Sequence, residues 1–205
     1  MTAKVILASG SPRRRELLRA LVPEYDVVSP DIPEPLTGDA RRDAETLAVA
    51  KARAIADQHP EAVVIGADTI VHDGTTLYGK PADAADAMRM LAELAGRQHE
   101  VVTGIAVSTL GAVTSAISTA DVRIASLGSQ TIAAYVATGV PLDKAGAYAI
   151  QDDGFGIVER STGCYCCVVG LPLWRLRALL TAAGVECDEP STSIARCVLC
   201  PERPV

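Results

Sequence analysis

The sequence predicts an α/β protein built around a mixed β-sheet. Strand-like apolar runs alternate with helical patterns along most of the chain, which is typical of α/β folds. Leu110-Gly111 separates two long strand-like runs, and so short a link predicts a hairpin and at least one antiparallel pair. Both alternating faces of residues 62–71 are apolar, so we expect a central strand that is covered on both sides.

Several residues mark where the predicted helices begin and end. Asp39 is suited to cap the second helix, Pro81 or Asp83 marks the start of the third, and Gly139 ends the fourth. The expected strands are residues 4–8, 25–29, 62–71, 100–109, 112–124 and 156–160. The expected helices are residues 12–21, 40–58, 82–94, 129–138 and 172–183.

Composition excludes several classes of partner. The chain has 205 residues, 49% of them apolar, which is enough for one sizeable core or two lobes. A net charge of −6 and few aromatic residues argue against a nucleic-acid polymer. No apolar run reaches the ~18 residues of a membrane span, and the N-terminus enters a strand without a signal segment. We therefore expect a cytoplasmic protein with no nucleic acid and no membrane as partner, and a small anion in a local basic pocket remains compatible with this charge.

The cysteines are confined to the last part of the chain. A disulfide framework would spread them over the fold, so their crowding favours a reduced, cytoplasmic protein. Cys197-Val-Leu-Cys200 is a single C-x-x-C pair, which by itself is a weak indication of zinc, although Cys164-Tyr-Cys-Cys167 could supply partners. Residues 185–205 are polar, carry three prolines and lack periodicity, which predicts a tail after a domain of residues 1–184.

An anion site is predicted at the start of the chain. The strand ends at Ser9-Gly10, and a helix then begins with Ser11 as its N-cap and Pro12 at its first position. Arg13 and Arg14 follow in the first turn, where the helix dipole disfavours cations. Arginines at this place indicate an external anion, and we expect a phosphate.

Asp68 lies within the predicted central strand. A buried carboxylate is costly unless a cation or hydrogen bonds meet it. It could be a structural group bonded to the backbone, or a metal ligand or general base at a strand end. Its neighbour Thr69 could pack in the core or bond to a substrate, and this run alone leaves both choices open.

Two lysines are candidate phosphate ligands. Lys51 interrupts the apolar face of its helix, between Leu47 and Ile55, so it either extends to solvent at the rim or points inward toward charge. Lys80 lies in a turn just before a helix, where it is either a solvated surface residue or a phosphate ligand.

Three further polar residues have weaker signals. Prolines on both sides of Glu34 fix its loop, which makes it a better ligand candidate than Asp31. Gln151 carries an amide that both donates and accepts, so it could recognise a base edge. His99 is alone, and a lone histidine is more often structural than catalytic.

Six short motifs follow one another in a specific order. They are Ala8-Ser-Gly-Ser-Pro-Arg-Arg14, Gly66-Ala-Asp-Thr69, Gly79-Lys-Pro81, His99-Glu-Val-Val-Thr-Gly104, Pro141-Leu-Asp-Lys-Ala-Gly-Ala-Tyr-Ala-Ile-Gln151 and Val168-Val-Gly-Leu-Pro172. Together they closely resemble the Maf family of nucleotide pyrophosphatases, over about residues 4–184. The resemblance implies a Maf/ITPase-like fold, a twisted mixed sheet with flanking helices in two lobes around a deep cleft.

The resemblance also implies an activity. Family members hydrolyse nucleoside triphosphates to a monophosphate and pyrophosphate with a divalent cation, Mg²⁺ or Mn²⁺, and the motifs look like those of the dTTP/UTP-preferring branch. It implies that Asp68 is the catalytic acid/base, that Glu34 and Asp68 bind the metal, and that a homodimer is the expected assembly. The implied base-choice residues are Arg13, Thr69 and Gln151. The implied phosphate-binding residues are Ser9, Arg13, Arg14, Lys51 and Lys80.

One departure and two other functions stay open at this point. Cys166-Cys167 stands where relatives often carry Ser-x-Asn, so we expect altered hydrogen bonding there. The protein could be a pyrophosphatase with another base choice, modified bases included, or a nucleotide-binding regulator of septum formation with incidental turnover. Asp68 together with the lysines favours an enzyme, because a binding protein needs cations but has less need of a base.

Overall fold

The protein is described by a computed structural model that covers residues 4–204. Its strands are β1 (Val5–Ala8), β2 (Asp26–Val27), β3 (Val63–His72), β4 (Leu77–Tyr78), β5 (Gln98–Thr109), β6 (Ala112–Ile124) and β7 (Val158–Gly163). Its α-helices are α1 (Pro12–Leu18), α2 (Ala40–Ala56), α3 (Ala84–Leu94), α4 (Ser129–Ala137), α5 (Tyr165–Val169) and α6 (Leu173–Ala182). Short 3₁₀ turns are η1 (Val140–Asp143), η2 (Ala145–Ala147), η3 (Asp153–Phe155), η4 (Pro190–Thr192) and η5 (Ala195–Cys197).

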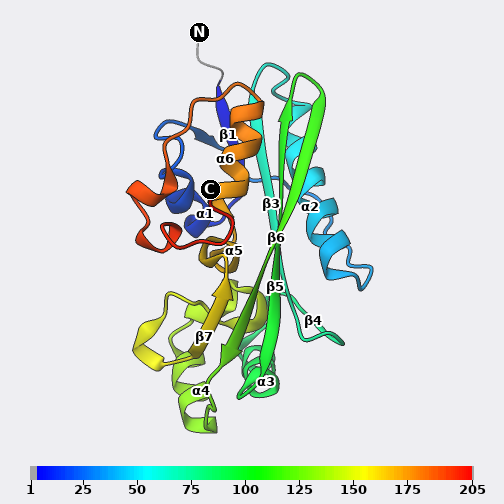
Figure 1. The fold of residues 1–205 in the computed structure, drawn as a ribbon. Coiled ribbons are helices and arrows are strands. Elements are labelled where there is room, and N and C mark those ends of the chain that lie inside the picture. Colours follow the sequence, from blue (N-terminus) through cyan, green and yellow to red (C-terminus); the bar gives the residue numbers. More distant parts are fainter. Residues whose placement is uncertain (1–3, 205) are drawn as a thin grey trace.

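The strands form one mixed sheet in the order β2-β1-β3-β5-β6-β7, with β4 paired to β3 (Figure 1). β1 pairs in parallel with β2 and β3, whereas all the other pairs are antiparallel. The expected hairpin is confirmed, because Thr109 pairs with Ala112 across the link between β5 and β6. The predicted α/β class and mixed sheet are therefore correct, and β3 is the central strand that its two apolar faces predicted.

Helix α2 packs against one face of the sheet, over β3, β5 and β6 (Figure 1). A Cβ at Gly66 in β3 would lie 2.1 Å from the carbonyl oxygen of Ala48, and one at Gly104 in β5 would lie 2.3 Å from that of Ala44. Only glycine leaves room for so close an approach. These two glycines therefore set how near the side chains of α2 come to β3.

We expect Gly66→Ala to lower the free energy of unfolding by about 1–3 kcal/mol, because the new methyl group meets helix backbone that cannot turn aside. Equilibrium unfolding in urea measures this loss. Gly79→Ala is the matched control, since a Cβ there meets nothing within 4 Å. Equal stability of the two variants would show that the close approach of α2 does not matter.

The opposite face carries two hydrophobic cores. The first packs α1, α5 and α6 against β1 and β3, and the second packs α3 and α4 against the far ends of β5 and β6 (Figure 1). Leu18, Leu171 and Leu176 are fully buried in the first core, and Leu91 and Ile124 in the second. The two cores correspond to the two lobes that were expected.

Some elements differ from the sequence expectation. β2 is only two residues long, and β7 begins two residues later than expected and runs three residues further, to Gly163. Strand β4 and helix α5 were not expected at all. α5 consists of Tyr165-Cys-Cys-Val-Val, whose composition favours a strand, and it is helical because Cys166, Cys167 and Val169 pack into the first core.

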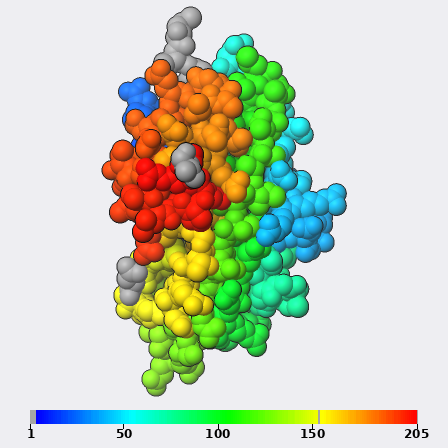
Figure 2. All heavy atoms as spheres, viewed as in Figure 1, coloured from blue at the N-terminus to red at the C-terminus, as the bar shows by residue number. Residues whose placement is uncertain are grey.

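The C-terminal segment, residues 185–204, packs against the body of the protein. Figure 2 shows this segment as a red patch that lies against α6, which is orange. The indole nitrogen of Trp174 donates to the carbonyl of Cys197 at 2.9 Å, and Cys197 and Cys200 are buried in the first core. Its polar composition predicted a tail, and the division after residue 184 stays a prediction, but the described part of the segment belongs to the core.

Candidate active site

A cavity of about 580 Å³ lies between the two lobes, where β1 and β3 meet the N-terminal part of α1 and the middle of α2. The η1–η2 region, α5 and residues from the segments 29–36 and 78–80 also line it. Every site residue predicted from the sequence lines this cavity: Ser9, Arg13, Arg14, Glu34, Lys51, Asp68, Thr69, Lys80 and Gln151. The structure thus brings together residues that are separated by more than 140 positions, although their individual roles stay predictions.

The β1–α1 turn forms as its residues predicted. Ser11 caps α1 by accepting from the backbone nitrogen of Arg14 at 3.4 Å, and Pro12 occupies the first turn. Ser9 is buried, and its hydroxyl accepts from the backbone nitrogen of Ser11 at 3.2 Å and from Arg14 at 3.4 Å. Ser9 therefore holds the turn together as well as facing the cavity.

Arg14 is tied to the protein rather than free. Its guanidinium donates to the carbonyls of Ala67 at 2.9 Å and Gly170 at 2.8 Å, and to the hydroxyl of Thr69 at 3.0 Å. Burial lowers the pKa of Arg14 below its usual value, against the opposing charge of Asp68. Arg14 therefore joins α1, β3 and the end of α5, and it contributes positive charge beneath the cavity.

Thr69 belongs to a chain of hydroxyl groups. The Thr103 hydroxyl donates to the carbonyl of Cys167 at 2.8 Å, so in its 2.9 Å contact with Thr69 it must accept. Thr69 thus donates to Thr103 and accepts from Arg14, which leaves it one free acceptor position. Toward a ligand, Thr69 can only accept a hydrogen bond.

Lys51 and Asp68 form a buried ion pair at the floor of the cavity. Lys51 Nζ lies 2.6 Å from Asp68 Oδ1 and 2.7 Å from Glu34 Oε1. The side chains of Lys51 and Asp68 are only 9% and 10% exposed, whereas that of Glu34 is 51% exposed. The sequence left Lys51 either at the rim or pointing inward, and the structure places it inward between two carboxylates.

The opposite wall holds residues to which the sequence assigned no role. Asp143 pairs with Arg13 at 3.2 Å and with Lys144 at 2.7 Å, and both Asp143 and Lys144 line the cavity. Burial raises the pKa of Asp143, but Lys144 and Arg13 outweigh this effect and hold the pKa below its usual value. Both residues lie in the motif of residues 141–151, and this motif was the feature of the sequence from which they could have been found.

Lys80 and Gln151 are exposed at the edge of the cavity, and both line it. Asp31, which the sequence made a weaker ligand candidate than Glu34, is not among the described residues that line the cavity. The rim therefore offers a cation and an amide above the buried Lys51–Asp68 pair.

His99 and Cys167 are buried groups close to the site. His99 Nε2 lies 2.7 Å from the hydroxyl of Tyr148, and burial lowers its pKa to about 4, so it is neutral at pH 7. The Cys167 thiol donates to the carbonyl of Ser118 at 3.2 Å. Burial raises the pKa of Cys167 to about 11, which keeps it protonated. Both act in packing and hydrogen bonding.

The donor set suits a hard divalent cation. Asp68 and Glu34 both offer carboxylate oxygens to the cavity, and one or two carboxylates together with substrate phosphates are what Mg²⁺ ordinarily uses. In this structure the Lys51 ammonium group lies between the two carboxylates and balances their negative charge. The remaining cations, Arg13, Lys80 and Lys144, surround a space that fits a polyphosphate.

The comparisons with known proteins agree with this geometry. The chain is 45% identical over 184 residues to the dTTP/UTP pyrophosphatase of Deinococcus radiodurans, covering 89% of this chain and 94% of the relative. It is 49% identical over 176 residues to the dTTP/UTP pyrophosphatase of Geobacter metallireducens, covering 83% of this chain and 91% of the relative.

A solved structure shares the fold, and a family model covers most of the chain. The structure of a HAM1 protein from Coxiella burnetii superposes with a TM-score of 0.51 at 16% identity, over 88% of this chain and 100% of that one. The family model described as Maf-like protein matches residues 4–183, which is the part of the chain that carries both lobes and the cavity. The protein belongs to the Maf family.

Proposed function

We propose that this protein hydrolyses nucleoside triphosphates, with dTTP and UTP preferred, to the nucleoside monophosphate and pyrophosphate. The observation that carries the proposal is the buried Lys51–Asp68 pair, at the floor of a cavity lined by further cations. A carboxylate placed beside bound phosphates can act as a general base toward water. The names of the two relatives, and the membership of the family, support the same activity.

Asp68 acts as the general base toward the attacking water molecule. It accepts a proton from the water as the oxygen forms a bond to the α-phosphorus, and the bond from that phosphorus to the β-phosphate oxygen breaks. Pyrophosphate leaves with the electron pair, so the monophosphate keeps the new oxygen. Lys51 holds the Asp68 carboxylate at the floor of the cavity, through the 2.6 Å contact between them, until substrate arrives.

The cations stabilise the charge that builds up on the phosphates. Lys51, Lys80 and Arg13 are close enough to the cavity to bind the β- and γ-phosphates, and their effect is largest in a site from which water is excluded. Arg14 is held by four protein acceptors, so we propose that it acts through its charge and by fixing Ser9 and Thr69.

A divalent cation, Mg²⁺ or Mn²⁺, would be held by Glu34 and Asp68. When bound, it would neutralise phosphate charge and polarise the attacking water. Glu34 lies on a loop stiffened by prolines, and its carboxylate contacts the same lysine as Asp68, so the two carboxylates could share one metal.

Base choice would depend on Thr69, with Gln151 and Arg13. Thymine and uracil both carry an N–H donor on the edge that pairs with adenine, and Thr69 can only accept. Cytosine has an acceptor at the corresponding position and would not satisfy it. The Gln151 amide at the rim can both donate and accept, so it can complete recognition of the carbonyl oxygens.

We also propose that the protein acts in the cytoplasm, as the six free thiols among its described residues support. No helix among residues 4–204 is both long enough and apolar enough to cross a bilayer. A homodimer stays a prediction from the family resemblance, and sedimentation analysis of the purified chain would test it.

The test is pyrophosphate release from canonical and modified nucleoside triphosphates, with Mg²⁺ or Mn²⁺, in water labelled with ¹⁸O. We expect dTTP and UTP to be turned over at least about tenfold faster than dCTP, with the label in the monophosphate. Label in the released pyrophosphate would refute attack at the α-phosphorus. Fast turnover of other bases would overturn the base preference only. Nucleotide binding without any turnover would instead favour a nucleotide-binding regulator of septum formation.

A further inference from the structure

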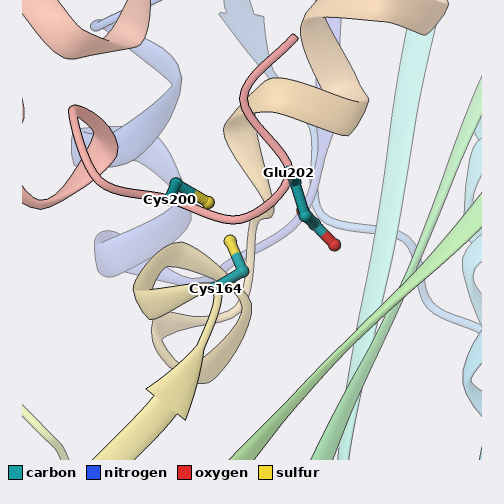
Figure 3. Close-up of side chains that lie close together, drawn as sticks. All are labelled: Cys164, Cys200 and Glu202. Atoms are coloured by element: carbon teal, nitrogen blue, oxygen red, sulfur yellow. The ribbon is translucent and has the colours of Figure 1, made fainter. Parts of the chain in front are cut away.

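A second polar cluster lies away from the cavity, where the C-terminal segment meets the start of α5. It consists of Cys164, which directly follows β7, and of Cys200 and Glu202 from the C-terminal segment (Figure 3). Their ligand atoms all lie within 4.8 Å of one another, and the two cysteines are only 2% and 8% exposed. None of the three lines the active-site cavity.

Glu202 carries the strongest sign that the cluster is incomplete. Its side chain is 10% exposed, and Oε1 accepts from Arg175 Nε at 2.6 Å. The other oxygen, Oε2, is buried and has no hydrogen-bond partner in the described part of the chain. A buried carboxylate oxygen without a partner is costly, so a group that the protein itself does not supply is expected beside it.

The chemistry of the donors selects the type of group. A disulfide between Cys164 and Cys200 would use both sulfur atoms and still leave Glu202 Oε2 without a partner. A hard cation such as Mg²⁺ avoids thiolates, whereas Zn²⁺ accepts sulfur and carboxylate oxygen together. Two thiolates and one carboxylate are three protein ligands, and a water can fill the fourth position of a tetrahedral zinc site.

We propose that Cys164, Cys200 and Glu202 bind a zinc ion that fastens the C-terminal segment to α5. Figure 3 shows the two sulfur atoms turned toward each other, with Glu202 beside them. Arg175 fixes the carboxylate through Oε1 and leaves Oε2 for the metal. Because α5 also contributes Val168 and Val169 to the cavity wall, the ion would hold that wall in place from behind.

The experiment measures zinc content and Co²⁺ absorption of the reduced, full-length protein. We expect about one zinc per chain, and with Co²⁺ a sulfur-to-metal charge-transfer band. Cys200→Ser should remove the band and most of the zinc. Glu202→Gln keeps the side-chain volume, so it should fold while it weakens zinc affinity at least about tenfold.

Two controls separate this site from the other thiols and from the active site. Cys187→Ser changes a half-buried cysteine of the same segment that lies outside the cluster, and it should bind zinc like the wild type. Asp68→Asn should also keep the zinc, since Asp68 lies in the cavity. The proposal is overturned if the wild type takes up no zinc, if Cys200→Ser keeps it, or if peptide mapping finds Cys164 joined to Cys200.

Discussion

Replacing Asp68 by Asn lowers kcat for dTTP by about 10²–10⁴-fold, because the variant has lost the group that accepts the proton of the attacking water. Asn has nearly the same size as Asp and can still contact Lys51, so the cavity keeps its shape. The Kd for dTTP, measured by calorimetry without the divalent cation so that no turnover occurs, should change much less than kcat. This separation between turnover and binding is what a base predicts, and the loss of a phosphate ligand would affect both.

The control for Asp68→Asn is Asp31→Asn, which removes a carboxylate from the loop that carries Glu34 but is absent from the described lining of the cavity. Asp31→Asn should retain wild-type kcat and Kd. A reduction in kcat of less than tenfold for Asp68→Asn would assign the base to another group. Glu34 would then be the candidate, because it is the other carboxylate in contact with Lys51.

Much of the fold could be predicted because its signals are local. The apolar run of β3, the Asp39 cap of α2 and the two-residue link between β5 and β6 each determine a structure within a few residues. Helix α5 could not be predicted in this way. Its sequence favours a strand, and the packing of its cysteines against distant parts of the first core makes it helical.

The residues that line the cavity could be predicted, but the contacts that they make with one another could not. The periodicity of α2 marked Lys51 as an interruption of an apolar face, yet whether it faces Asp68 depends on Gly66, which lets the helix approach β3. Arg14 was expected to meet an external anion, but its acceptors come from residues 67 and 170, which only the folded chain brings near. The same long-range contacts place Cys200 beside Cys164.

Replacing Lys51 by Met lowers the free energy of unfolding by about 3–5 kcal/mol, as expected when one partner of a buried ion pair is removed. Met retains the length and the apolar stem, so the loss comes mainly from charge. Without the ammonium group, the carboxylates of Asp68 and Glu34, which both touch Nζ in the wild type, face each other with no cation between them. Equilibrium unfolding in guanidinium chloride measures the change.

A double-mutant cycle separates this charge effect from packing. When Lys51→Met is combined with Asp68→Asn, the buried charge that lost its partner is also gone, so the pair should be less destabilising than the sum of the single changes by about 1–3 kcal/mol. Lys80→Met provides the surface control: it removes a lysine from the rim of the same cavity and should change stability by less than about 0.5 kcal/mol. If the two single effects simply add, the contribution of Lys51 to stability does not depend on the charge of Asp68. Its place between the carboxylates would then serve substrate binding alone, and kcat and KM of Lys51→Met would change without any coupling to Asp68.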